Sequence, residues 1–145
     1  MITHSIEIGR GPEEVFAYLY QLERHGEWQS QIVSTKVETD GPVRVGTRVH
    51  EIRKIGGRER DTSYEVTEHD PPRKSSFRGV VGPVRPDGTV TIEPVGDGSS
   101  SRVSIAFHLV GHGFGKLIAP LARMQARKSI VESQEQLKAK LETSA

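Results

Sequence analysis

The sequence contains no cysteine among its 145 residues. This absence excludes disulfide bonds, a thiol nucleophile and thiolate ligands for a metal. No apolar run approaches the roughly 20 residues that a membrane span requires. Residues 1–8 alternate in polarity instead of forming the apolar core of a signal peptide. We therefore expect no membrane span and a cytoplasmic location.

An excess of one charge is also absent. Twenty Lys and Arg residues stand against 19 Asp and Glu residues, for a formal net charge of +1. The basic residues between 53 and 60 are interrupted by Glu59. Nucleic-acid-binding domains usually concentrate positive charge, so we expect no nucleic-acid partner. The length favours one domain over residues 1–145, as a monomer or a weak homodimer.

The clearest pattern is a long helix over residues 111–141. Three glycines occupy positions 111, 113 and 115, and no glycine follows them. The apolar residues then recur mostly three and four positions apart, at Phe114, Leu117, Ile118, Leu121, Met124, Ile130, Val131, Leu137 and Leu141. This spacing predicts an apolar stripe that faces a partner surface. Pro120 should kink the helix or mark the end of its first turn.

The rest of the chain predicts the sheet on which that helix lies. Residues 2–9 alternate as in a half-buried strand, and Pro12 opens a short helix with an apolar face. A second short helix or turn carries Trp28. Further strands are expected at residues 32–37, 49–55, 62–68, 75–81, 89–95 and 102–110, with a hairpin at Gly56-Gly57. Consecutive antiparallel strands followed by a helix indicate the α+β class.

These segments, in this order, resemble the START-like or SRPBCC superfamily, and within it the polyketide cyclase/dehydrase group. The resemblance rests on residues 12–19, Trp28, residues 41–47, residues 64–73, residues 93–98 and residues 115–121 leading to 137–142. The group often has a threonine where this chain has Ser99-Ser100-Ser101, and an aromatic residue near Val90. The loss of that aromatic residue changes the expected lining of the cavity.

The resemblance implies a helix-grip fold. A curved antiparallel sheet of about six to seven strands would wrap around the C-terminal helix, with a cavity between them and two short helices after the first strand. Members bind lipids, polyketides or other apolar molecules, and some catalyse cyclisation or dehydration. No cofactor is implied. Fold alone does not choose among these functions.

Motifs for other chemistry do not match. The glycines before the long helix lack the spacing of a phosphate loop or a dinucleotide fingerprint. His108 and His112 would lie about 13 Å apart on a strand, too far to share a metal ion. No metal site and no catalytic constellation are therefore predicted, and whether the protein is an enzyme stays open.

Aromatic and apolar residues give the candidate ligand-binding site. The residues expected to border the cavity are Trp28, Tyr64, Phe77, His108, Phe114, Leu117, Leu121 and Met124. The first hypothesis is a protein that binds a lipid or polyketide-like molecule. The second is an aromatase/cyclase or dehydratase with His108, Tyr64 or Arg78 as acid or base. The third is a protein-interaction module with a filled core and an exposed apolar patch.

Overall fold

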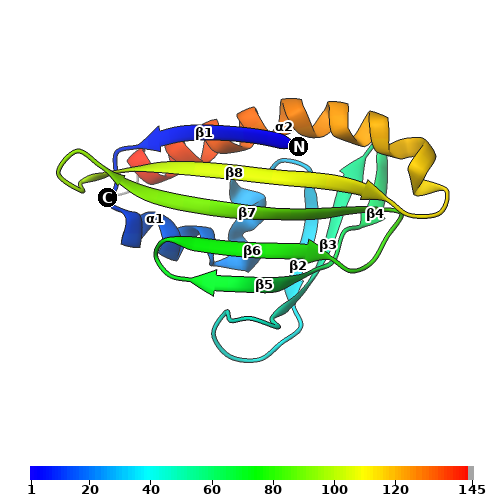
Figure 1. Cartoon of the computed structure of the whole chain (residues 1–145), viewed down its shortest axis with the longest axis horizontal. Helices are drawn as coiled ribbons and strands as arrows, with labels where there is room; N and C mark the ends of the chain where they lie inside the picture. The colour runs from blue at the N-terminus through cyan, green and yellow to red at the C-terminus, as the bar shows by residue number, and fades with distance from the viewer. Residues whose placement is uncertain (144–145) are drawn as a thin grey trace.

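The computed structural model describes residues 1–143 and contains one curved sheet, one long helix and two short helices (Figure 1). The elements in chain order are β1 (Ile2–Ile8), α1 (Pro12–Leu19), the 3-10 helix η1 (Leu22–Glu27), β2 (Ile32–Val37), β3 (Arg48–Ile55), β4 (Arg58–Asp61), β5 (Tyr64–Asp70), β6 (Lys74–Gly79), β7 (Val84–Val95), β8 (Ser100–Gly111) and α2 (Gly115–Thr143).

The sheet is antiparallel throughout, with the strand order β1-β8-β7-β6-β5-β3-β2 and with β4 paired to β3. Helix α2 lies against β1, β7 and β8, while α1 packs against β7 and β8 and η1 packs against β2. The sheet therefore curls around α2, and the predicted α+β helix-grip architecture is confirmed. No helix among residues 1–143 is long and apolar enough to cross a membrane.

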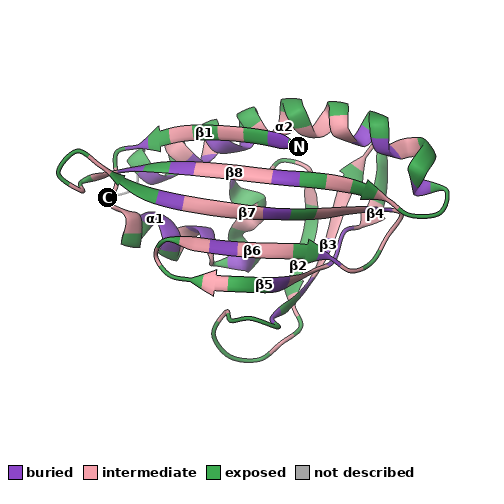
Figure 2. Cartoon of the chain, in the orientation of Figure 1, coloured by how far each residue is buried: buried purple, intermediate pink, exposed green. Residues whose placement is uncertain are grey.

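The hydrophobic core lies toward the end of the molecule where α1 meets the C-terminal half of α2. Alternation along β7 and β8 points Ile92 and Val103 inward, and these side chains are almost fully buried. Figure 2 shows buried positions on both strands. They pack with Ile8, Val15 and Leu137. The core fills this end, so that the remaining space under the sheet lies toward the N-terminal half of α2.

The strand expected at residues 62–68 corresponds to β5, and a short strand that the sequence did not predict, β4, precedes it. The Gly56-Gly57 turn joins β3 to the short strand β4, and the chain then leaves the ladder at Thr62 and Ser63 before β5 begins. Strand β5 pairs with β3 at only two positions, Arg48↔Glu65 and Val49↔Tyr64. One edge of β3 thus pairs with two successive strands, β4 and β5. The alternation of side chains along a strand does not reveal such an arrangement.

The face of α2 that packs on the sheet also differs from the prediction. The large apolar side chains just before the helix and in its first turns are exposed: Phe114, Leu117, Leu121 and Met124. The buried residues there are small: Gly115, Ala119 and Ala122. A Cβ atom on Gly115 would lie 1.7 Å from the carbonyl oxygen of Pro83, so the helix approaches the neighbouring backbone too closely for larger residues. Pro120 lies inside a helix that continues on both sides of it.

Candidate functional site

A cavity of about 220 Å³ lies between the sheet and α2. Residues of η1 and the segment that follows it line one side, and the middle of α2, from Ala122 to Ser133, lines another. Its walls come from most of the chain: Leu19, Tyr20, Leu22, His25, Trp28, Gln29, Gln31, Glu51, Arg53, Lys54, Ile55, Thr62, Tyr64, Val66, Ser75, Phe77, Val84, Pro86, Val90, Ile105, Phe107, Leu109, Ala122, Gln125, Ala126, Ser129, Ile130 and Ser133.

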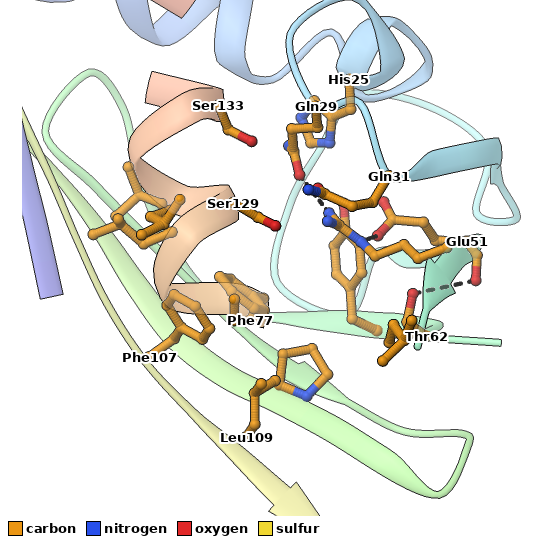
Figure 3. A pocket seen from close by; sticks show the side chains of 18 of the residues that line it. His25, Gln29, Gln31, Glu51, Thr62, Phe77, Phe107, Leu109, Ser129 and Ser133 are labelled. Carbon is orange, nitrogen blue, oxygen red and sulfur yellow. Dashed lines mark hydrogen bonds and ion pairs between the residues drawn. The ribbon is translucent and has the colours of Figure 1, made fainter. Parts of the chain in front are cut away.

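The two sides of this cavity differ in chemistry. Figure 3 shows Phe77, Phe107 and Leu109 together on the side of the sheet, while Gln29 and Glu51 lie on the opposite side. The apolar side comes mainly from the inward residues of β6, β7 and β8, and the polar side from β3 and the segment after η1. A molecule held here would meet apolar walls along most of its surface and polar groups at one end.

The polar end is organised by Glu51. This side chain is only 2% exposed, and its Oε1 atom accepts a 2.5 Å hydrogen bond from Nε of Arg53. Arg53 in turn donates through Nη2 to the side-chain oxygen of Gln29. The second carboxylate oxygen, Oε2, is buried and has no hydrogen-bond partner among the described residues. A buried carboxylate oxygen is stable only with a donor, so the cavity offers an acceptor that a ligand hydroxyl can satisfy.

Local strand geometry places this pair. Val49, Glu51 and Arg53 are two residues apart on β3, so all three side chains point to the same face of the strand. The residue just after β4 holds the backbone of Glu51, because Thr62 donates its N–H to the carbonyl oxygen of Glu51 over 2.8 Å. The carboxylate is therefore fixed where the pairing of β3 passes from β5 to β4.

Trp28 and His25 form the wall beside this pair. Their rings meet edge to face with centroids 5.4 Å apart. The carbonyl oxygen of Leu19 lies 2.6 Å from Nε2 of His25, and since a carbonyl can only accept, Nε2 carries the proton. Burial lowers the pKa of His25 and keeps the ring neutral. The indole Nε1 of Trp28 is buried without a partner in the described chain, which adds an unused donor to the cavity wall.

Two tyrosines also face the cavity. Tyr64 meets Phe77 edge to face at 5.6 Å, so the phenol joins the polar end to the apolar side. Burial, followed by the negative charge of Glu51, raises the pKa of Tyr64 well above that of an ordinary phenol. Burial likewise raises the pKa of Tyr20 to about 12. Both side chains therefore remain protonated hydrogen-bond donors at neutral pH.

The apolar side depends on a glycine between two aromatic rings. Gly88 on β7 lies opposite Phe77 on β6 and opposite Phe107 on β8. A Cβ atom at this position would come within 2.5 Å of the Cβ atom of Phe107. Only glycine leaves Phe107 in its place, so this residue shapes the apolar wall.

One edge of the cavity is held by a contact between α2 and the β3–β4 hairpin. The side chain of Gln125 accepts a hydrogen bond from the N–H of Gly56 over 2.9 Å and donates to the carbonyl oxygen of Lys54 over 3.0 Å. Both Lys54 and Gln125 line the cavity. The hairpin tip is thus fastened to the helix by one side-chain amide.

The structure brings together three of the eight residues that the sequence suggested. Trp28, Tyr64 and Phe77 line the cavity. His108 is exposed on the outer face of β8, because the inward positions of that strand belong to Phe107 and Leu109. The other four residues are exposed just before α2 or on its first turns, outside the cavity: Phe114, Leu117, Leu121 and Met124. Arg78, suggested as an acid or base, is also exposed on β6.

Sequence reasoning missed the residues that define the polar end, Glu51, Arg53 and Gln29. The available signal was the shared face of Val49, Glu51 and Arg53, which puts two charged residues in line with an apolar one on β3. On the described part of the chain, no group of three or more His, Asp or Glu side chains is arranged to hold a metal ion.

Comparison with solved structures shows the same fold over almost the whole chain. A protein from Thermus thermophilus, TTHA0849, is 21% identical, with a TM-score of 0.77 and coverage of 99% of both chains. The Zhui aromatase/cyclase from Streptomyces sp. R1128 is 12% identical, with a TM-score of 0.83 and coverage of 97% of this chain and 92% of that one. A START superfamily protein from Mycobacterium smegmatis is 14% identical, with a TM-score of 0.71 and 97% coverage of both.

At these identities the structural likeness shows the fold alone. No curated protein matches the chain by sequence. A family model described as "Polyketide cyclase / dehydrase and lipid transport" matches residues 1–142. With this match over almost the whole chain, the chain belongs to the polyketide cyclase/dehydrase and lipid transport family.

Proposed function

We propose that this protein binds an apolar small molecule that carries a hydroxyl group at one end. The observation that carries the proposal is the cavity, whose apolar side faces a buried acceptor, Oε2 of Glu51, that no described residue satisfies. A hydroxyl on the ligand would donate to this oxygen, and its apolar body would lie against Phe77 and Phe107.

Cavity volume limits the size of the bound part. An apolar protein cavity of about 150 Å³ is known to hold benzene. The 220 Å³ available here therefore suits a body of about two fused aromatic rings, or an aliphatic group of similar bulk. A filled core, which an interaction module would have, does not agree with this volume.

Isothermal titration calorimetry with 2-naphthol and 2-methoxynaphthalene tests the proposal. The two probes have the same ring system, but only the naphthol can donate to Glu51. We expect 2-naphthol to bind about tenfold more tightly, as one hydrogen bond to a charged group supports. Absence of heat with both probes would contradict binding in the cavity, and equal affinities would contradict recognition of the hydroxyl.

Glu51→Gln gives the sharper measurement. Arg53 can only donate, so the amide oxygen should keep the contact with Arg53 and the NH₂ group should replace Oε2. Both probes can accept a hydrogen bond from that group, so we expect their affinities to converge. His108→Gln, on the outer face of β8, is the matched control and should keep the wild-type preference.

A second candidate function, cyclisation of a poly-β-ketone, is favoured by the same carboxylate. Oε2 of Glu51 would take a proton from a carbon between two carbonyl groups, and that carbon would bond to a second carbonyl carbon. The resulting alkoxide would then recover the proton from Glu51. Loss of water from the product would complete a dehydration. Tyr64 would donate a hydrogen bond to the developing alkoxide.

Mass spectrometry distinguishes the two functions. The protein would be incubated with a synthetic poly-β-ketone thioester of N-acetylcysteamine, and products would be compared with a protein-free sample. Ring formation with loss of water in the presence of the wild type, and its disappearance in Glu51→Gln, would support the enzyme. Tight binding of 2-naphthol without any turnover would leave the binding function alone.

A further inference from the structure

The first turns of α2 and the residue just before the helix carry exposed large apolar side chains that we call the apolar ridge: Phe114, Leu117, Leu121 and Met124. Leu117 is 84% exposed and Phe114 is 66% exposed. The last three are spaced four and three residues apart in α2, so they share one side of the helix. Figure 2 shows exposed residues recurring along the outer side of these turns. A patch of this kind marks an interaction surface.

A row of basic residues runs beside the ridge. Lys116, Arg123 and Arg127 are seven and four residues apart, one position out of step with the ridge, so they occupy the adjacent strip of the helix. Lys128 lies one turn beyond Met124, on the same side of the helix as the apolar ridge. From Gly98 to Val131 the sequence contains no Asp or Glu. The charge that residues 98–131 contribute beside the apolar ridge is therefore of one sign.

The hairpin that adjoins the ridge extends this surface. A Cβ atom on Gly56 would lie 3.6 Å from a methyl group of Leu121, so the β3–β4 turn borders the ridge. Lys54 and Arg58 are exposed on either side of that turn. Glu59, the acid nearest to the turn, stands opposite Lys54 in the strand ladder. The hairpin therefore does not cancel the positive charge that α2 places beside the apolar ridge.

These features select among possible partners. A second copy of the chain would place one basic row against another, which opposes association through this face. An anionic lipid bilayer offers both complements, because acyl chains accept the apolar ridge and headgroups attract the cations. We propose that the apolar ridge and its basic row dock this protein on the surface of an anionic lipid bilayer, with Phe114 and Leu117 inserted most deeply.

Vesicle co-sedimentation tests the proposal. Wild-type protein should sediment with vesicles of phosphatidylcholine mixed with phosphatidylglycerol, bind those of phosphatidylcholine alone much more weakly, and dissociate as salt is raised. Protein that stays in the supernatant with the anionic vesicles would overturn docking. Equal binding to both vesicle types would overturn the role of the basic row.

Variants locate the surface. Phe114→Asp combined with Leu117→Asp should reduce vesicle binding about tenfold or more, because two apolar side chains are lost from the bilayer contact. Val45→Asp, at an exposed apolar residue on another loop, is the matched control and should bind as the wild type does. Equal losses in both would overturn the assignment to α2. Lys116→Gln with Lys128→Gln should weaken binding to anionic vesicles and flatten its salt dependence.

Two further measurements distinguish bilayer docking from binding to an acidic protein and from ligand binding in the cavity. Retention on immobilised polyglutamate without vesicle binding would overturn the lipid assignment in favour of an acidic protein surface. Calorimetry with 2-naphthol should be unchanged in Phe114→Asp/Leu117→Asp, since neither residue lines the cavity. The proposal of bilayer docking and the proposal of ligand binding in the cavity are therefore tested independently.

Discussion

Oε1 of Glu51 lies 2.5 Å from Nε of Arg53, two residues further along the same strand. Neighbouring inward positions of β3 thus hold opposite charges under the sheet, the carboxylate fully buried and the guanidinium partly so. Removal of two charges from water is unfavourable, and the pair persists because each charge compensates the other. The arrangement keeps one carboxylate oxygen occupied and leaves the other buried without a hydrogen-bond partner among the described residues.

A double-mutant cycle measures this coupling. Arg53→Met leaves a buried carboxylate without its cation and should lower the free energy of unfolding by about 3 kcal/mol. Glu51→Leu with Arg53→Met removes both charges and should lose less than the sum of the single variants, with a coupling above about 1 kcal/mol. Urea unfolding of the four proteins provides the measurement. Additive losses would show that the two charges do not depend on each other.

Replacement of Gly88 should disturb the apolar wall. Gly88→Ala places a methyl group against Phe107 and the strand backbone, which we expect to destabilise the protein by about 1–3 kcal/mol and to weaken naphthol binding. Thermal unfolding and calorimetry check both effects. The control is Gly26→Ala, whose new Cβ atom would approach no closer than 3.9 Å to Ile32 and should change stability by less than about 0.5 kcal/mol.

The lowered pKa of His25 leads us to expect that the free energy of unfolding falls on mild acidification. Burial lowers its pKa in the folded protein, so below about pH 6.5 the unfolded chain binds the proton more readily. The stabilisation is complete above that pH and is lost as pH falls toward the depressed pKa. His69, whose pKa burial also lowers, acts in the same direction.

Urea unfolding between about pH 5 and pH 7 measures this dependence. His25→Gln should flatten the pH dependence of stability, and His69→Gln should isolate the smaller remainder. An unchanged slope in His25→Gln would mean that the buried imidazole does not control stability in this range.

Gln125 should control the edge of the cavity. Gln125→Met keeps the size of the side chain but removes both hydrogen bonds to the β3–β4 hairpin, which should lower the free energy of unfolding by about 1 kcal/mol and speed ligand release. Amide hydrogen exchange at Gly56 should also accelerate. Gln136→Met, where the amide donates to Glu132 one turn away in the same helix, is the control and should leave Gly56 unchanged.

Much of the fold is readable from the sequence, because alternation on β8 and the long glycine-free segment of α2 are strong periodic signals. Periodicity predicted the wrong residues where burial depends on how closely the helix approaches the surface on which it packs. The apolar spacing predicts one buried stripe along α2, and Leu137 and Leu141 are buried as expected. In the first turns, however, Ala119 and Ala122 are buried and the larger residues are exposed. A helix that approaches backbone closely buries its small residues, and only the structure reveals that distance.

The candidate site was predictable to the extent that it rests on aromatic residues. Trp28, Tyr64 and Phe77 line the cavity because each lies on an element that borders it. The polar end escaped prediction, since strand register decides by a single residue whether Glu51 faces the cavity or solvent. Register is set by the pairing of β3 with both β4 and β5, which no local pattern contains.

Trp28 is the only tryptophan in the sequence, and it stands in the cavity wall with an indole N–H that no described residue accepts. The intrinsic fluorescence of this protein is therefore a single-site signal from the cavity. A ligand that hydrogen-bonds to the indole or displaces polar surroundings will shift its emission, without any attached dye. The ridge on α2 contains no tryptophan, so docking there is optically silent unless it also alters the cavity.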